Sequence, residues 1–103
     1  MKIVGIAACT SGIAHTYIAR EKLIRAAEAL GHEAHVETQG TIGTENQLNQ
    51  KDIDEDDFVI VAADIKVGGR ERFKGKHVID VPTHVVIKSP QALINKIIDE
   101  INK

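Results

Sequence analysis

The chain has 103 residues, with 13 Lys and Arg against 15 Asp and Glu, and its formal net charge is -2. A charge this small argues against nucleic acid or an anionic lipid surface as the main partner. Apolar residues make up 43% of the chain and include no Trp, two Phe and one Tyr. This composition is typical of an aliphatic α/β core, and the length predicts a single domain over residues 1–103.

The first third of the chain predicts a strand, a helix and a second strand. Residues 2–8 are a continuous apolar run rich in β-branched side chains, the pattern of a strand covered on both faces. From about 14–30, apolar residues recur at spacings of three and four, which predicts an amphipathic helix with Gly31 as its C-cap. Residues 32–37 alternate weakly and predict a short strand. We interpret 36–46, which contains two glycines, as a loop.

The middle of the chain predicts a short helical turn, a strand and a loop. Asn49 and Asp52 have the spacing of a capping box that opens a helical turn. Residues 58–63 are all apolar and predict the third strand. Residues 66–76 combine five basic residues with three glycines, which is typical of a loop. The basic run is either a solvated loop or a docking surface for a phosphorylated partner.

The last quarter predicts a strand and a helix. Residues 77–81 are a plausible fourth strand, which Pro82 ends. Ser89 and Pro90 have the pattern of an N-cap followed by proline at the first helical position. The apolar residues between 93 and 101 then recur at helical spacing, so the chain is expected to close with an amphipathic helix.

Strands that alternate with helices predict a parallel sheet with right-handed crossovers. The expected fold class is a small flavodoxin-like or Rossmann-like α/β domain, with four parallel strands and helices on both faces in a three-layer α/β/α arrangement. In such sheets a site lies beyond the carboxyl ends of the strands where the strand order reverses, here between the first and third strands. Cys9 and Asp64 directly follow those two strands.

Cys9 is the only cysteine, and it lies between the first strand and the first helix. Backbone N–H groups and the helix dipole at that position favour anions, so Cys9 is a candidate nucleophile that could carry a phosphoryl group. The predicted phosphate-binding residues that follow it are Thr10, Ser11, Gly12, Ile13, Ala14, His15 and Thr16. The alternatives are a buried structural thiol for Cys9 and a simple N-terminal cap for Thr16. We assign Asp64 to holding this loop by hydrogen bonds.

The residue six positions after Cys9 separates two kinds of chemistry. A cysteine phosphatase of the Cys-five residues-Arg type needs arginine there, because a guanidinium clamps the phosphoryl group with two hydrogen bonds. Here the position is His15, which offers one softer contact. The spacing therefore favours a site that holds a phosphoryl group and passes it on over one that hydrolyses it.

Several short motifs are spread along most of the chain. With Cys9 these are residues 12–17 (GIAHTY), 31–32 (GH), 36–40 (VETQG), 42–43 (IG), 46 (N), 52–53 (DI), 59–60 (VI), 62–64 (AAD) and 72–76 (RFKGK). Together they closely resemble the fructose-specific or fructose-like IIB component of the bacterial phosphoenolpyruvate-dependent sugar phosphotransferase system. The resemblance extends to about Lys88. It departs from the family at Thr10 and Ser11, where members usually carry proline and threonine.

The resemblance implies a protein-Nπ-phosphohistidine–sugar phosphotransferase. Cys9 would take a phosphoryl group from a phosphohistidine of the IIA component and give it, from a phosphocysteine, to fructose or a similar sugar held by the membrane component IIC. The expected location is the cytoplasm, with membrane association through IIC; a lone cysteine cannot form an internal disulfide and requires no oxidising compartment. No cofactor, metal or nucleic acid is expected. His32 and His35 are poorly placed to share a metal.

Two other function classes stay open on the sequence alone. The first is a cysteine-dependent phosphatase or an arsenate-reductase-like enzyme, against which His15 argues. The second is a non-catalytic regulatory or nucleotide-binding module on the same fold. The chain has neither a GxGxxG run nor a Walker-type lysine to support nucleotide binding.

Overall fold

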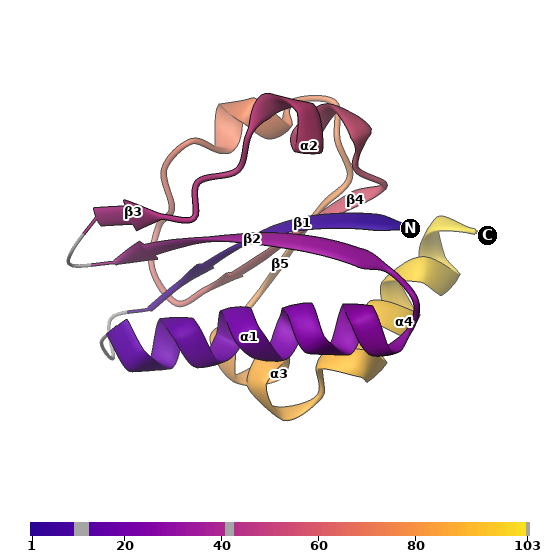
Figure 1. The fold of residues 1–103 in the computed structure, drawn as a ribbon, viewed down its shortest axis with the longest axis horizontal. Helices are drawn as coiled ribbons and strands as arrows, with labels where there is room; N and C mark the ends of the chain where they lie inside the picture. Colours follow the sequence, from indigo (N-terminus) through magenta and orange to yellow (C-terminus); the bar gives the residue numbers. More distant parts are fainter. Residues whose placement is uncertain (10–12, 41–42, 103) are drawn as a thin grey trace.

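A computed structural model describes residues 1–9, 13–40 and 43–102 of the chain. The sheet has five strands in the order β3-β2-β1-β4-β5 (Figure 1). The strands are β1 (Lys2–Ala8), β2 (Glu33–Gly40), β3 (Gly43–Glu45), β4 (Phe58–Ala63) and β5 (Val78–Val81). The four predicted strands are parallel to one another, and the unpredicted β3 is an antiparallel strand at the edge, paired with β2.

Helices cover both faces of the sheet, which confirms the predicted three-layer arrangement. They are α1 (Ile13–Ala29), α2 (Gln50–Glu55), the 3-10 helix η1 (Arg70–Phe73), α3 (Thr83–Lys88) and α4 (Pro90–Ile101). Helices α1, α3 and α4 pack on one face, and α2 with η1 covers the other (Figure 1). Among the described residues, no helix combines the length and the apolar character needed to cross a bilayer.

The continuous apolar run of β1 is explained by a core on each side of the sheet. Ile3 and Ala7 belong to the core beneath α1, whereas Val4, Ile6 and Ala8 belong to the core beneath α2. Side chains alternate between the two faces of a strand, so a strand covered on both faces needs apolar residues at every position. This strand is buried from its second residue to its last.

Both caps that the sequence predicts for α1 and α2 are confirmed. Gly31 has a φ of 84°, and the N–H of His32 donates to the carbonyl of Ala27 at 2.8 Å, the long hydrogen bond of a Schellman motif. Glycine adopts this left-handed conformation without a Cβ clash. At the start of α2, the Oδ1 atom of Asn49 accepts a hydrogen bond from the N–H of Asp52 at 2.8 Å.

The prediction of a loop over 36–46 is wrong for 36–40 and 43–45, which form strands, whereas 41–42 lie outside the described residues. Strand β2 continues to Gly40 and pairs with the antiparallel β3, with Thr38 opposite Glu45. The outer half of β2 carries polar residues, and two of them, Glu37 and Thr38, are buried. This part of the strand carries buried polar side chains where a strand usually carries apolar ones. Its sequence therefore lacks the alternation of apolar and polar residues that predicts a strand.

The prediction also omits helix α3. Its sequence, THVVIK, contains three β-branched residues besides Val86, and six residues are too few to show a helical period. Val86 is fully buried against the core beneath α1. Ser89 follows at the N-cap position of α4, where its side chain makes no capping hydrogen bond; its backbone N–H donates to Val85 at 2.9 Å and ends α3.

Asp56, between α2 and β4, carries a carboxyl group that is enclosed by the fold. Its side chain is 0% exposed, and the nearest cation, Lys76 Nζ, lies 3.6 Å from Oδ1. Neither carboxyl oxygen has a hydrogen-bond partner among the described residues. Burial raises the pKa of Asp56 even though Lys76 acts in the opposite direction. The ionised carboxyl therefore destabilises the fold, and stability falls as pH rises from the unfolded pKa through the folded one.

Asp56→Asn is expected to raise the free energy of unfolding at neutral pH by about 1 kcal/mol, because it removes a buried charge that lacks hydrogen bonds. The gain should shrink as the pH is lowered below the ordinary aspartate pKa, where the wild-type carboxyl is protonated in both states. Denaturant titrations across this pH range measure the effect. Asp54→Asn, at an exposed position, is the control and should change stability by less than about 0.5 kcal/mol. Equal shifts for both variants would contradict the interpretation.

Candidate functional site

The carboxyl ends of β1 and β4 meet at one edge of the sheet, as predicted. The two strands are parallel neighbours, and their last residues, Ala8 and Ala63, are paired. Strand β2 lies on the other side of β1, so the strand order reverses between β1 and β4. Cys9 and Asp64, which follow these strands, are thereby brought together. The N–H of Asp64 donates to the carbonyl of Ala8 at 3.1 Å.

Cys9 and Asp64 are in direct contact at this edge. The Sγ atom of Cys9 donates a hydrogen bond to Oδ2 of Asp64 at 3.1 Å. Cys9 is 4% exposed, whereas Asp64 is an exposed residue. The candidate nucleophile thus lies at the rim of the core, and its sulfur is bonded to a carboxylate that solvent reaches.

A third residue, Thr83, completes this contact and was not predicted. It is the first residue of α3 and is 1% exposed. Its N–H donates to Oδ1 of Asp64 at 3.1 Å, and its hydroxyl donates to Oδ2 at 2.6 Å. One signal could have indicated it: the predicted strand 77–81 is parallel to its neighbours, so residues just after it also reach the edge that holds Cys9.

The predicted phosphate-binding loop is only partly described by the structure. Thr10, Ser11 and Gly12 lie outside the described residues, and so do the side chains of Ile13, Ala14 and His15. Helix α1 begins at Ile13, so the Cys9 segment leads directly to the amino end of a 17-residue helix. Thr16 is 3% exposed and lies inside α1, so its interpretation as a simple N-terminal cap is wrong.

A buried ion pair supports the strand next to β1. Arg72 of η1 donates two hydrogen bonds to Glu37 of β2, Nη1 to Oε1 at 2.8 Å and Nη2 to Oε2 at 2.9 Å. The N–H of Leu48 and Nε2 of Gln39 also donate to this carboxylate. Burial alone would raise the pKa of Glu37, but the hydrogen bonds from Arg72, Gln39 and Leu48 outweigh it and lower the pKa. Glu37 is therefore a fully ionised carboxylate with its hydrogen bonds satisfied.

The side chain of Gln39 fastens the segment after β4 to the end of β2. Its Oε1 atom accepts from the N–H of Gly68 at 2.9 Å, and its Nε2 atom donates to the carbonyl of Gly68 at 2.9 Å. Gln39 is paired with Ala8, the last residue before Cys9 in β1. This double hydrogen bond therefore positions a loop beside the sheet edge that carries Cys9.

Gln39→Ala is expected to speed amide hydrogen exchange at Gly68 about fivefold to tenfold, since it removes a hydrogen bond worth about 1 kcal/mol. Exchange followed by NMR measures the change at this single amide. Gln50→Ala is a suitable control, because the Gln50 side chain donates to Asp54 on the surface of α2, far from Gly68 in the sequence. Unchanged exchange at Gly68 in Gln39→Ala would show that the loop holds its position without this contact.

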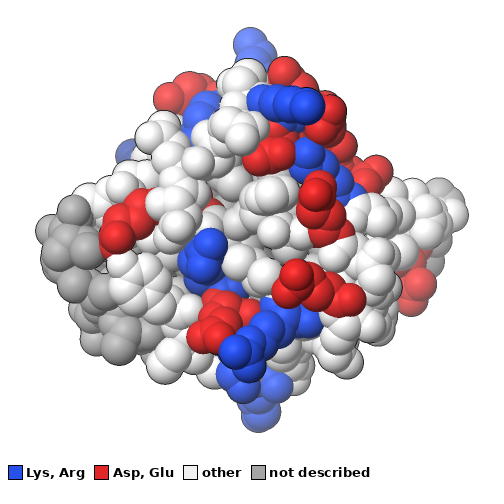
Figure 2. Space-filling view, viewed as in Figure 1, with Lys and Arg blue, Asp and Glu red and all other residues white. Residues whose placement is uncertain are grey.

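The basic run 66–76 is largely neutralised within the molecule. Arg70 pairs with Asp80 through two hydrogen bonds, Arg72 pairs with Glu37, and Lys76 donates to the carbonyl of Asp54. Figure 2 accordingly shows acidic and basic residues interspersed over the face in view. Three of the five basic side chains in the run therefore make contacts within the molecule, and docking of a phosphorylated partner stays a prediction.

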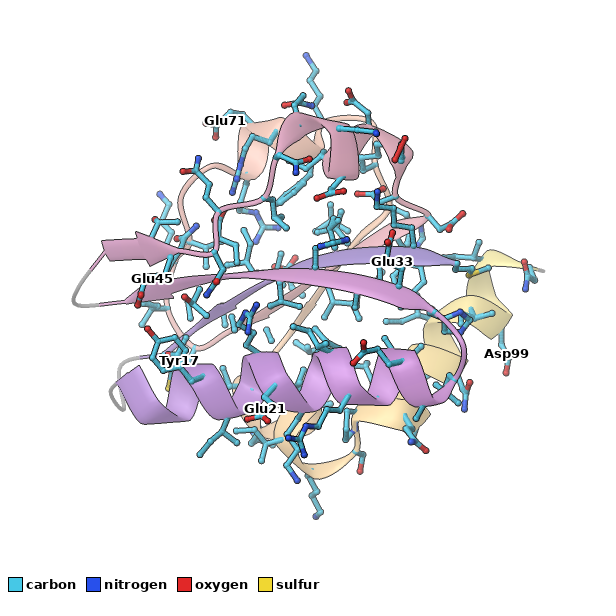
Figure 3. The ribbon with its side chains drawn as sticks, viewed as in Figure 1. Tyr17, Glu21, Glu33, Glu45, Glu71 and Asp99 are labelled. Atoms are coloured by element: carbon cyan, nitrogen blue, oxygen red, sulfur yellow. The ribbon has the colours of Figure 1, made fainter. Side chains whose placement is uncertain are left out.

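Helix α1 is also tied to the β2–β3 hairpin. The hydroxyl of Tyr17 donates to Oε1 of Glu45, and the two side chains meet between α1 and β3 in Figure 3. This hydrogen bond raises the pKa of Tyr17. The contact joins the first turns of α1 to the edge strand β3. The helix that follows the Cys9 loop is therefore fixed to the edge of the sheet as well as packed on its face.

The described residues contain no cluster of three or more His, Cys, Asp or Glu side chains arranged to hold a metal ion. His35 lies beside Asp52 and Glu33 at the opposite end of β2 from the Cys9 edge. The expectation of a metal-free site stays a prediction.

Comparison with known proteins gives one consistent family. Residues 4–96 match the family model described as the lactose/cellobiose-specific IIB subunit of the PTS system. The chain is 46% identical over 96 residues to the fructose-like EIIB component 2 of the PTS system of Escherichia coli K12, covering 93% of this chain and 91% of that protein. It is 43% identical over 99 residues to the fructose-specific EIIABC component of Bacillus subtilis 168, of which it spans 15%.

Solved structures agree with this assignment. The solution structure of an enzyme IIB subunit of the PTS system from Escherichia coli K12 superposes with a TM-score of 0.91 at 33% identity, covering 98% of this chain and 94% of that one. A crystallised domain of a fructose-specific IIABC component from Borrelia burgdorferi gives a TM-score of 0.86 at 40% identity, covering 91% and 89%. The family description and the relatives' names differ in the sugar that they state, lactose or cellobiose against fructose.

Proposed function

This chain belongs to the IIB components of the sugar phosphotransferase system, and we propose that Cys9 is the residue that carries the phosphoryl group. It accepts the group from a phosphohistidine of a IIA component and passes it to a sugar bound by a membrane IIC component. The relative from Bacillus subtilis is named as an EIIABC component, with A, B and C parts in one protein. That arrangement supports IIA and IIC as the two partners of a IIB chain.

The observation that carries this proposal is the position of Cys9. The thiol lies at the carboxyl end of β1, where the strand order reverses, and four positions before Ile13, the first residue of α1. Ligands of parallel α/β sheets bind at such a point, and the helix dipole there favours a negative phosphoryl group. Residues 10–16 supply the backbone N–H groups and hydroxyls of the proposed phosphate cradle.

Two in-line displacements make up the proposed reaction. In the first, the sulfur of Cys9 attacks phosphorus, a P–S bond forms, the P–N bond breaks, and the imidazole of the donor leaves. In the second, a sugar hydroxyl attacks the same phosphorus, a P–O bond forms, the P–S bond breaks so that the sulfur leaves, and the hydroxyl proton is released to water. Phosphoryl transfer depends chiefly on positioning and charge stabilisation, so a buried sulfur at a fixed strand end is suited to both steps.

The proposal also covers the cellular location of the chain and the sugar that finally accepts the phosphoryl group. We place the chain in the cytoplasm, where it acts as a single IIB domain over residues 1–103 and meets the membrane only through IIC. The relatives named fructose-like and fructose-specific support fructose or a similar sugar as the final acceptor. The sugar itself is held by IIC, so its identity depends on that partner.

Phosphoryl transfer along the relay tests this function. The protein is mixed with the general phosphotransferase proteins, a fructose-type IIA component and labelled phosphoenolpyruvate. The expected result is one phosphoryl group per chain, which is lost on addition of membranes that contain IIC and the sugar. Failure to accept any phosphoryl group from IIA would overturn the proposal.

A second assay separates the relay from the rival class of cysteine phosphatases. An aryl phosphate is offered to the protein alone. The absence of an arginine at position 15 predicts no sustained turnover, because the site lacks the guanidinium that stabilises hydrolytic transfer. Steady release of phosphate by the isolated chain would favour the phosphatase class instead.

A further inference from the structure

The hydrogen bond between Cys9 and Asp64 needs a chemical explanation. A carboxylate 3.1 Å from a sulfur disfavours a thiolate there, because two negative charges at that distance repel one another. It would disfavour a phosphoryl dianion on the sulfur for the same reason. In this proposed anion-binding site, however, the nucleophile lies against a carboxylate. A residue whose only role was to hold the loop by hydrogen bonds could have been an uncharged amide instead.

Proton transfer from the thiol to the carboxylate removes this conflict. Oδ2 of Asp64 lies 3.1 Å from the sulfur and accepts the hydrogen bond of the thiol, so the carboxylate already contacts the reacting atom. Once protonated, Asp64 is neutral and carries an O–H donor beside the sulfur. The proton therefore neutralises the carboxylate of Asp64 at the moment when the negatively charged phosphoryl group becomes attached to Cys9.

We propose that Asp64 is a catalytic base that takes the Cys9 proton as the sulfur attacks phosphorus, with Thr83 as the residue that positions it. The proposal rests on the phosphoryl relay proposed above. In the first displacement the P–S bond forms, the P–N bond breaks, and the proton moves from Sγ to Oδ2. In the second, the P–S bond breaks and the protonated Asp64 returns its proton to the departing sulfur.

Thr83 fixes the carboxylate in the orientation that this step requires. Its backbone N–H holds Oδ1 at 3.1 Å, and its hydroxyl holds Oδ2, the same oxygen that faces the sulfur, at 2.6 Å. Thr83 is 1% exposed and so has little freedom to move. Since general bases act only within hydrogen-bond reach of the proton, this anchoring is part of the proposed function.

The solvent contact of Asp64 fits the same role. Cys9 is buried, but Asp64 is exposed. Asp64 returns its proton to the sulfur in the second displacement and so ends each cycle ionised, the state that contact with solvent favours. A purely structural carboxylate would gain nothing from exposure, since hydrogen bonds to charged groups are stronger away from water.

Two measurements on four variants test the proposal. The variants are Asp64→Asn, which keeps the shape and one of the two oxygen acceptors for Thr83, Thr83→Val, which removes the hydroxyl, Thr83→Ser, which restores it, and Cys9→Ser. The first measurement is the single-turnover rate of phosphoryl transfer from phosphorylated IIA. The second is the ratio of Cys9 alkylation rates with iodoacetate and iodoacetamide, which reports the charge beside the sulfur whatever its exposure.

Asp64→Asn is expected to slow transfer by on the order of 10²-fold or more, the contribution typical of a general base. The same variant should raise the iodoacetate-to-iodoacetamide ratio, because an anionic reagent no longer meets a carboxylate. Thr83→Val should slow transfer by a smaller factor, and Thr83→Ser should restore it. Circular dichroism checks that each variant folds.

Two results would overturn the inference about Asp64. One is wild-type transfer by Asp64→Asn; the other is an unchanged alkylation ratio in that variant. Neither result would contradict the proposed phosphoryl relay, as long as wild-type protein accepts a phosphoryl group and Cys9→Ser does not. If wild-type protein accepts none, the relay itself fails, and the two failures are thereby distinguished.

Discussion

Cys9→Ser is expected to slow phosphoryl acceptance from IIA by about 10⁴-fold or more, the scale on which removal of a covalent nucleophile acts. A serine hydroxyl at this position is a far weaker nucleophile than a thiol. The measurement is the rate of labelling from phosphorylated IIA. Cys9→Ala should be equally inactive, because both variants lack the sulfur.

The fold should survive these substitutions. Cys9 lies at the end of β1 and is bonded to Asp64, so a serine can keep the hydrogen bond to the carboxylate. Melting curves of wild-type protein and Cys9→Ser are expected to differ little, which assigns the loss of transfer to chemistry. Rapid labelling of a folded Cys9→Ser protein at another residue, such as His15, would contradict the proposed phosphocysteine.

Glu37→Ala is expected to lower the free energy of unfolding by about 3 to 5 kcal/mol, because it leaves the guanidinium of Arg72 without its carboxylate partner in a largely buried position. The side chain of Glu37 is 1% exposed and that of Arg72 is 19% exposed. The substitution also removes the acceptor of the Leu48 N–H, which adds an unsatisfied buried donor. Denaturant unfolding measures the change, and Arg72→Ala should have an effect of similar size.

The chain supplies a matched control for this prediction. Arg70 and Asp80 form a pair with the same two-hydrogen-bond geometry, at 2.6 and 2.9 Å, but their side chains are 44% and 58% exposed. Asp80→Ala should therefore cost less than about 1 kcal/mol, as exposed ion pairs do. Equal costs for the two substitutions would show that burial is not what makes the Glu37 pair important.

The stability that Glu37 provides has a defined pH dependence. Its pKa in the folded protein is lowered, so its contribution is fully present above the ordinary glutamate pKa. As the pH falls through the lowered pKa, the folded state must take up the proton as well, and the contribution is lost. The difference in unfolding free energy between wild-type protein and Glu37→Ala should therefore narrow in acid.

The elements that the sequence predicts best are those whose side chains alone determine them. Strands β1 and β4 match the predicted ranges 2–8 and 58–63, because strands buried on both faces need uninterrupted apolar runs. The rule that ligands bind where strand order reverses then brings Cys9 and Asp64 together before any coordinates are known. Gly31 is predicted for a comparable reason, since few residues other than glycine adopt its φ.

What the sequence does not predict depends on contacts between distant residues. Strand β3 and the outer half of β2 are stabilised by polar contacts, among them the pair of Glu37 with Arg72, 35 positions apart. No local sequence pattern predicts an ion pair between residues so far apart in the chain. Thr83 is missed because its helix is short and β-branched, and Asp64 is assigned to the loop although the structure bonds it to the sulfur itself.

The most direct test of the account is to locate the phosphoryl group by tandem mass spectrometry. Wild-type protein is labelled with phosphoenolpyruvate, the general phosphotransferase proteins and IIA, and is digested under conditions that preserve a phosphothiol. The account predicts a single modified residue, Cys9, on the peptide that begins at the end of β1, and no modified peptide from Cys9→Ser. A phosphoryl group on His15 or on any other residue, with Cys9 unmodified, would contradict it.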